Sequence, residues 1–411
     1  MKRSHTPPQR SLRVSDTANS VLQNRINISI IFNYLRDHGV SYRARIARDL
    51  GISAPAVARA IGRLLNDAYV TESERVQVEN GRKAAQVSVN AGRGYIIGAD
   101  LLSDPVRFAI SDFSGTLHAT FSAQPMVNSV DYLDHLIESV DAGWSNFLNE
   151  FPDKDARILA LGVGVPAVVN PQTGTILYAN LYERLLRSDF YAKISGHYEF
   201  PVFIENTSNL SAIAEWKRGA GRGMRNLVFI ELGNGIGAGI ILEGDLYHGA
   251  QGAAGEIGYF LTGPDGLGYD GKKVGYLESK ASLLSMHRSG SHFRGDPVHF
   301  NQALPDLFRL ATSGDGTALG IIGDAVRHLT VSIVNIMLLL NPDTVIIGGA
   351  ACGLPGADAL ILNPLIEEVR RIYPFAPAAI RLGDLGADAG LIGAVQFALD
   401  SLVVHAYPYR L

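Results

Sequence analysis

The 411-residue sequence has one cysteine, few charged residues and no long uninterrupted apolar run. The single cysteine, Cys352, excludes a disulfide within the chain and a cysteine-rich zinc site, and it fits a reducing compartment. The first residues are basic but lack the apolar segment of a secretion signal, and no later stretch offers the roughly 18 uncharged apolar residues of a membrane span. We therefore expect a cytoplasmic protein that is neither secreted nor inserted in a membrane.

Apolar residues are abundant, and the charges are unevenly distributed. Hydrophobic residues make up 47% of the chain and charged residues 18%, which indicates two or three domains with large packed cores. Residues 1–90 hold 14 Lys and Arg against 7 Asp and Glu, whereas the remainder holds 22 against 33. This asymmetry indicates that the front of the chain meets a polyanion and the back does not. Chance scatter of basic residues is the alternative.

The front of the chain has the pattern of a winged helix-turn-helix, which we assign to residues 20–90. Apolar residues recur at helical spacing and stop before Gly39, and Gly51 supplies a tight turn between two further helices. Two strands joined by a basic turn complete the pattern. The predicted segments are a flexible basic arm over residues 1–19, helices over 20–38 and 43–50, a third helix that Ser53 caps, and strands over 71–78 and 84–90.

This pattern predicts binding to duplex DNA. A helix-turn-helix places its second helix in the major groove, and a basic wing reaches the phosphates or the minor groove. The alanines that begin the third helix can contact thymine methyl groups only, so we expect a larger share of the affinity from the wing. A small helical subdomain with a hairpin is the alternative. The residues predicted to contact DNA are Arg43, Ser53, Ala54, Ala56, Arg59, Arg63, Arg82 and Lys83.

After Asn90 the sequence changes to alternating strands and helices. Two openings, at residues 95–121 and 227–249, each have the pattern strand, turn, strand, turn, strand, and helical segments follow each of them. We therefore predict two lobes of related design, over residues 91–205 and 206–411. On its own, this duplication is weak evidence for the actin-like fold that sugar kinases and heat-shock ATPases share.

The motifs of the second half give a more specific resemblance. IENTSNLSAIAEWKRGAGRG leads into LVFIELGNGIGAGIILEGDLYHGAQGAAGEIGY, and GVGVPAVVNPQTGTILYANLY, VIIGGAACGLPG and LGADAGLIGAVQFAL stand in order around them. These motifs resemble those of the ROK family, and with the front segment the chain is similar to its repressor branch, which includes xylose- and N-acetylglucosamine-type repressors. The resemblance implies an α/β actin-like, ribonuclease H-like two-lobed fold behind an N-terminal winged helix-turn-helix.

The resemblance also implies a set of sugar-binding residues. Buried amides and carboxylates suit a ring of hydroxyls, because leaving such a group unpaired costs about 1–3 kcal/mol and so discriminates between ligands. Thr207 and Tyr259 stand at family positions where this sequence differs. The residues implied to contact a sugar or sugar derivative are Asn180, Asn206, Thr207, Glu256 in GEIGY, Tyr259 and Glu278 in GYLE.

Departures from the family motifs argue against catalysis. Thr207 stands where the family has the aspartate that acts as general base, and its hydroxyl cannot accept a proton at neutral pH. Residues 100–104, Asp-Leu-Leu-Ser-Asp, replace a glycine turn that lets backbone amides approach a phosphate. The loop Gly233–Gly237 keeps its glycines, either for structure or for phosphate. Tyr259 replaces a zinc-binding histidine, and the segment that follows lacks the family's cysteines, so we expect no metal and no cofactor.

Together these patterns favour a transcriptional regulator, most simply a repressor. Its expected partners are double-stranded operator DNA and a sugar effector, and paired DNA half-sites imply a homodimer or a dimer of dimers. The first alternative is an ATP-dependent sugar kinase with a DNA-binding head. The second is a ligand-independent repressor whose pocket is vestigial.

Overall fold

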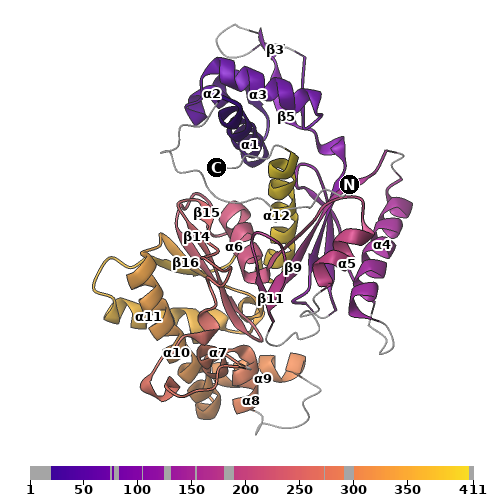
Figure 1. The fold of residues 1–411 in the computed structure, drawn as a ribbon. Helices are drawn as coiled ribbons and strands as arrows, with labels where there is room; N and C mark the ends of the chain where they lie inside the picture. The colour runs from indigo at the N-terminus through magenta and orange to yellow at the C-terminus, as the bar shows by residue number, and fades with distance from the viewer. Residues whose placement is uncertain are drawn as a thin grey trace.

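The computed structural model describes residues 20–74, 76–77, 83–103, 105–124, 131–152, 155–179, 189–272, 274–290 and 300–406. It consists of three parts, namely a small head formed by residues 20–90 and two lobes that each contain a five-stranded sheet. Figure 1 shows the head at one end of the molecule and the two lobes side by side below it.

The head contains the helices and the hairpin that the sequence predicts. Gly51 ends the second helix at φ 65°, a left-handed conformation that glycine adopts without strain. Ser53 occupies the N-cap position of the third helix, although its side chain makes no capping hydrogen bond. The elements are α1 (Ser20–His38), α2 (Arg43–Leu50), α3 (Ala54–Asn66), a sheet of β1 (Ser41–Tyr42), β5 (Gln86–Val89) and β2 (Val70–Glu72), and the hairpin of β3 (Val76–Gln77) and β4 (Lys83–Ala84).

The first lobe is built around a mixed sheet in the order β12-β9-β6-β7-β8. Strand β9 runs parallel to both β6 and β12, and the other pairs are antiparallel. Its elements are β6 (Tyr95–Asp100), β7 (Arg107–Asp112), β8 (Leu117–Ser122), α4 (Tyr132–Glu150), β9 (Ile158–Val165), the small pair β10 (Val168–Val169) and β11 (Ile176–Tyr178), α5 (Phe190–His197) and β12 (Val202–Asn206).

The last helix of the chain, α12 (Ala389–Ala406), covers one face of this first sheet. It approaches so closely that a Cβ at Gly98 would lie 2.8 Å from Val395 Cγ2, and one at Gly162 would lie 2.2 Å from the Ala394 carbonyl oxygen. The predicted boundary assigned this segment to the second lobe. The two glycines open the groove that the helix fills, so the first lobe is completed by the end of the chain.

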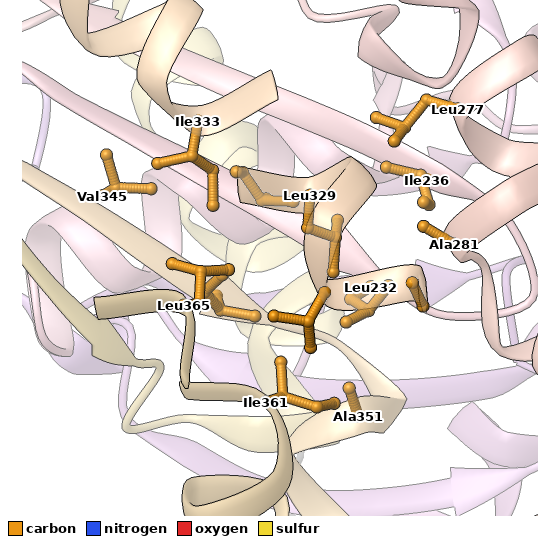
Figure 2. Packing of buried hydrophobic residues seen from close by; sticks show 14 of the residues in the cluster. Leu232, Ile236, Leu277, Ala281, Leu329, Ile333, Val345, Ala351, Ile361 and Leu365 are labelled. Atoms are coloured by element: carbon orange, nitrogen blue, oxygen red, sulfur yellow. The ribbon is translucent and has the colours of Figure 1, made fainter. Parts of the chain in front are cut away.

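The second lobe has the sheet order β15-β14-β13-β16-β17. Figure 2 shows Leu232 and Val345 of this sheet packed against Leu329 and Ile333 of the long helix α10 and Leu365 of α11. The elements are α6 (Thr207–Arg218), β13 (Leu227–Leu232), β14 (Ile236–Leu242), β15 (Asp245–Leu246), α7 (Tyr276–Ala281), α8 (Leu283–Ser289), α9 (Phe300–Thr312), α10 (Gly316–Leu340), β16 (Thr344–Gly348), α11 (Asn363–Ile372) and β17 (Ala379–Leu382).

Helices α6 and α12 lie side by side between the two sheets (Figure 1). A Cβ at Gly393 of α12 would lie 2.0 Å from the Leu210 carbonyl oxygen of α6, so only glycine permits this contact. On its opposite side α6 packs on β14, where a Cβ at Gly239 would lie 2.4 Å from Ala212 Cβ. The two helices therefore form a tightly packed layer that joins the lobes.

In the part of the chain that the structure describes, two apolar helices are long enough to cross a membrane by length and composition, which the sequence argument did not anticipate. They are Gly316–Leu340 and Gly386–Val404, and 56% and 61% of their apolar windows are buried inside the protein. Their apolar faces pack in the cores of the two lobes, as long core helices do.

The head packs directly on the first lobe, and the two share one hydrophobic core. The ring of Phe113, in the turn after β7, lies 5.4 Å from the ring of Phe32 in α1 and 5.2 Å from that of Tyr69. Arg93 stacks over Tyr69 at 4.1 Å. We call Phe32, Tyr69 and Phe113 the aromatic junction.

Candidate functional site

A cavity of about 120 Å³ lies where the strands of the two sheets end, at the carboxyl ends of β9, β12 and β13. Ligands commonly bind at this edge of α/β sheets. Five of the six predicted sugar-binding residues line the cavity, and the sixth, Asn180, lies outside the described residues. The lining residues are Leu102, Pro166, Ala167, Val168, Tyr178, Asn206, Thr207, Ser208, Glu231, Gly233, Asn234, Gly235, Ile236, Gly237, Glu256, Tyr259 and Glu278.

Two carboxylates of the second lobe interact electrostatically in this cavity. Glu278 Oε2 accepts a hydrogen bond from the Ile236 backbone N–H at 2.9 Å, which fixes its orientation. Burial and the neighbouring Glu278 raise the pKa of Glu256 to about 7. Burial also raises the pKa of Glu278, although the Ile236 N–H opposes the shift. Buried carboxylates of this kind gain from donors on a ligand, and hydroxyl groups are such donors.

Tyr259 forms a wall of the cavity together with a residue that the sequence reasoning missed. Its hydroxyl donates to the hydroxyl of Tyr178 at 3.0 Å, and Tyr178 donates to the Lys272 carbonyl oxygen at 2.9 Å. Burial raises the pKa of Tyr259, and the hydrogen bond to Tyr178 adds to that effect. These two hydrogen bonds link β11 to the loop before α7.

Among the described residues, no group of three or more His, Cys, Asp or Glu side chains could hold a metal ion.

Asn206 and Thr207 begin helix α6 at the cavity. The side-chain oxygen Oδ1 of Asn206 caps the helix by accepting from the Ser208 and Asn209 backbone N–H groups at 2.8 and 3.2 Å, and the side-chain Nδ2 donates to the Ala167 carbonyl oxygen at 2.9 Å. Most of the hydrogen-bonding capacity of Asn206 is therefore used within the protein. Thr207 is 3% exposed, and its hydroxyl has no partner within the described protein.

The two loops that the resemblance places at phosphate positions make close contacts within the protein. Asp100 accepts hydrogen bonds from the Leu102 backbone N–H at 3.0 Å and the Ser103 hydroxyl at 2.9 Å, and Leu102 lines the cavity. In the second loop a Cβ at Gly235 would lie 2.6 Å from Glu278 Oε2, and one at Gly237 would lie 2.6 Å from Ser208 Oγ. These close approaches account for the glycines at both positions without a phosphate.

Glu231 is a further cavity residue that the sequence reasoning missed. Burial raises its pKa to about 7, and the nearby charge of Asp100 adds to the shift. The available signal was a lone carboxylate within the otherwise apolar strand LVFIEL, which is costly to bury without a purpose.

The cavity connects to the head through α6 and α12. Lys217, near the end of α6, lies 2.7 Å from Asp400 Oδ2 of α12, and Arg36 of α1 lies 2.5 Å from Asp400 Oδ1. The Arg36 side chain is 1% exposed. Burial alone would raise the pKa of Asp400, but the two cations hold it below its usual range. We call Arg36, Asp400 and Lys217 the ion triad.

The predicted DNA-contacting residues of the head have several environments. Ser53, Ala54, Arg59 and Arg63 are exposed at or near α3. Ala56 is 8% exposed and faces the core of the head, which does not fit the predicted base contact.

Arg43 binds Glu72 of β2 through two hydrogen bonds, of 3.1 and 3.0 Å, so a DNA contact would compete with this pair. Arg82 and the side chain of Lys83 lie outside the described residues. Arg45 and Arg48 are additional exposed cations on α2, 3.4 and 3.1 Å from Asp49, that were not predicted.

Two sheet-based lobes around a cleft lined by carboxylates define the chain as a protein of the sugar-kinase-like, actin-like class. The model of the ROK family matches residues 97–401, and the chain belongs to this family. The glucokinase of Halalkalibacterium halodurans is 32% identical over 253 residues, which are 57% of this chain and 74% of that protein. The putative xylose repressor of Caldicellulosiruptor sp. strain Rt8B.4 is 26% identical over 408 residues, which are 95% of this chain and 99% of that protein.

Solved structures show the same fold. The ROK family transcriptional regulator described as a homolog of the E. coli MLC protein superposes with a TM-score of 0.74 at 20% identity, over 94% of this chain and 99% of that one. The ROK family glucokinase of Streptomyces griseus, solved with glucose and AMPPNP, superposes with a TM-score of 0.60 at 25% identity. That likeness covers 74% of this chain and 99% of the glucokinase.

Proposed function

We propose that the protein is a DNA-binding transcriptional repressor whose operator affinity is controlled by a sugar or sugar derivative. The observation that carries the proposal is the position of α6. This helix begins at the cavity with Thr207, and near its other end Lys217 connects it to the head through the ion triad. A ligand that moves this helix acts on the buried arginine of α1. Relatives that match nearly the whole chain, head included, carry the name xylose repressor.

The proposal treats the head as a winged helix-turn-helix. Helices α2 and α3 with the turn at Gly51 form the helix-turn-helix, and the hairpin of β3 and β4 is the wing. The exposed arginines of α3 would contact bases or phosphates, and the basic wing turn would add phosphate contacts. A homodimer or dimer of dimers would present paired heads to paired half-sites.

Ligand control follows from closure of the two lobes about the cavity. Helices α6 and α12 fill the space between the sheets so tightly that a side chain at Gly239 or Gly393 would clash. A change in the angle between the lobes must therefore shift the two helices. A coupling free energy of about 1–3 kcal/mol would change operator affinity roughly 5- to 150-fold.

We infer that the cavity binds a ligand without phosphorylating it. Thr207 offers no carboxylate to accept a proton. Leu102 and Asp100 stand where the family has a phosphate-binding turn, and the Asp100 carboxylate already accepts hydrogen bonds from within its own loop. Glucokinase relatives share the lobes, but these residues favour a sensor over an enzyme.

The test starts from DNA selected by the full-length protein out of a random duplex pool. We expect a selected sequence to bind with strong salt dependence, and D-xylose or another sugar to change its dissociation constant at least fivefold. Arg82→Ala in the wing should weaken binding several-fold, whereas Arg309→Ala on the exposed surface of α9 should not. If no sequence is selected, the protein is not a repressor. If sugars leave DNA affinity unchanged, the ligand-independent alternative holds.

A further inference from the structure

A loop of the second lobe contacts both lobes. This loop, residues 248–255, follows β15 and leads to the segment that lines the cavity. On the side of the second lobe, the Gly255 carbonyl oxygen accepts a hydrogen bond from the Ala238 backbone N–H of β14 at 2.8 Å. On the side of the first lobe, a Cβ at Gly252 would lie 2.2 Å from the Val169 carbonyl oxygen of β10. Movement of one lobe against the other must therefore disturb this loop.

A histidine at the start of the loop pairs with a carboxylate of the first lobe. His248 Nε2 lies 2.7 Å from Glu205 Oε2 near the end of β12. Glu205 is 3% exposed, and its other oxygen accepts hydrogen bonds from the Asn206 backbone N–H at 2.7 Å and from the Asn209 side-chain amide at 2.9 Å. Asn206 caps α6, and Asn209 lies in its first turn. The pair therefore joins the loop to the helix that leads to the head.

The charge of His248 depends on its partner. Burial alone would lower the pKa of His248, but the hydrogen bond and the charge of Glu205 raise it above its ordinary value of 6.5. A hydrogen bond between two charged groups is roughly twice as strong as one between neutral groups. The pair is therefore strongest below about pH 6.5, and it weakens as the pH rises through the raised pKa and His248 loses its proton.

Other charged groups near the pair lie on its own segment of the chain. Asp245 of β15 precedes His248, and Glu256 follows the loop, whereas β10, β14 and the first turn of α6 carry no charged side chain. Among the described residues, Glu205 is the one charged group that shares a hydrogen bond with His248. The pH dependence of the contact is therefore assigned to this pair.

We propose that His248 and Glu205 form a proton-dependent latch between the two lobes, through which pH acts on operator binding. Protonated His248 holds the loop against the first lobe and fixes the carboxylate that binds the start of α6. Near its other end α6 connects to the head through the ion triad, so protons and the ligand act on the same helix. The inference rests on the proposed function, because it assumes that the head binds operator DNA.

Amide exchange of the full-length protein, without sugar or DNA, tests the latch itself. After correction for intrinsic rates, we expect residues 249–255 of His248→Gln to exchange at least about threefold faster than in the wild type near pH 6, and at a similar rate near pH 8.5. The control is His118→Gln, which removes a histidine that lies 2.9 Å from Asp112 within the first lobe. A loop that exchanges equally in His248→Gln and the wild type near pH 6, or that is loosened equally at both pH values, overturns the latch.

Binding of DNA selected by the protein separates the latch from the proposed function. The dissociation constant is measured without sugar near pH 6 and near pH 8.5, at equal ionic strength. We expect the ratio of the two constants in His248→Gln to differ at least about threefold from the wild-type ratio, and the ratio in His118→Gln to equal it. Equal ratios in all three proteins contradict the action of the latch on the head and leave the repressor standing. If no duplex is selected, the repressor proposal fails, and amide exchange still decides whether the latch exists.

Discussion

The carboxyl group of Glu256 is held in a site that favours its neutral form. Its pKa is about 7 in the folded protein, against an ordinary value of 4.5. Below about pH 4.5 the group is neutral in both the folded and unfolded states, so it has no effect on stability. As the pH rises to about 7 the unfolded chain loses its proton first, and the free energy of unfolding falls.

Glu256→Gln should therefore stabilise the unliganded protein at alkaline pH. We expect its free energy of unfolding to exceed that of the wild type by about 1–3 kcal/mol near pH 8, and by much less near pH 5. Urea unfolding at a series of pH values measures the difference. Glu367→Gln, on the exposed face of α11, serves as the control, and an equal effect of Glu256→Gln at both pH values would show that the carboxyl is not perturbed.

Thr207→Val should affect the ligand more than the fold. The Thr207 hydroxyl is buried and has no partner among the described residues, so valine of the same shape should leave the midpoint of thermal unfolding equal or higher. Sugar affinity should fall by up to about tenfold, because one hydrogen bond to the ligand is lost. Thr330→Val, which alters a buried threonine bonded within α10, should leave sugar affinity unchanged. Undiminished affinity in Thr207→Val would remove this hydroxyl from the site.

Individual residues could be predicted only as far as their neighbours were local. The motifs correctly predicted that Glu256, Tyr259 and Glu278 share one site. Nothing in the sequence shows that the side-chain oxygen of Asn206 accepts a hydrogen bond as the cap of a helix. Glu231 stands out in the sequence as a lone carboxylate in the strand LVFIEL, but its place in the cavity was missed because Asp100, whose charge acts on it, lies in the first lobe and is distant in the chain. Ala56 was misplaced because helical spacing alone does not say which way a small side chain faces.

At the scale of elements, α6 links the cavity to the head, and Lys217→Met tests that link. The variant keeps the Arg36–Asp400 pair and the packing of the aliphatic part of the side chain at position 217. It removes the positive charge that pairs α6 with Asp400. We expect sugar affinity and DNA affinity without sugar to stay within about threefold of the wild type. The change in DNA affinity caused by sugar should fall at least about threefold.

The control for this variant is Lys193→Met, which removes a lysine paired with Asp131 and Asp134 in the first lobe. Fluorescence anisotropy with labelled DNA, with and without saturating sugar, gives all the required constants. A full sugar response in Lys217→Met would mean that the signal reaches the head by another route.

The elements themselves were predictable where their signals are local. Apolar spacing and the glycines at 39 and 51 marked the three helices of the head, and the observed bounds of the first two agree with the prediction. The position of α12 was not predictable, because it depends on glycines at 98 and 162, nearly three hundred and more than two hundred residues earlier, that open a groove in the first sheet.

At the scale of the whole molecule, the head and the first lobe share a core through the aromatic junction. We expect Phe113→Ala, in the first lobe, to destabilise the head, because truncating a fully buried phenylalanine costs about 3–5 kcal/mol. Amide exchange in α1 and α3 should accelerate, and DNA affinity should fall. Phe151→Ala, at an exposed phenylalanine after α4, is the matched control. Unchanged exchange in α1 would show that the head folds independently.

The aromatic junction also determines where this protein can be cut and rejoined. Residue 90 looks like a natural seam in the sequence, but in space the boundary runs between α1 and a surface made by Phe113, Leu399 and Val403. A chimera that receives a foreign head at residue 90 keeps a docking surface shaped for the old one. Transplanting DNA specificity between relatives therefore requires exchanging that surface too, or changing only the exposed residues of α3 and the wing.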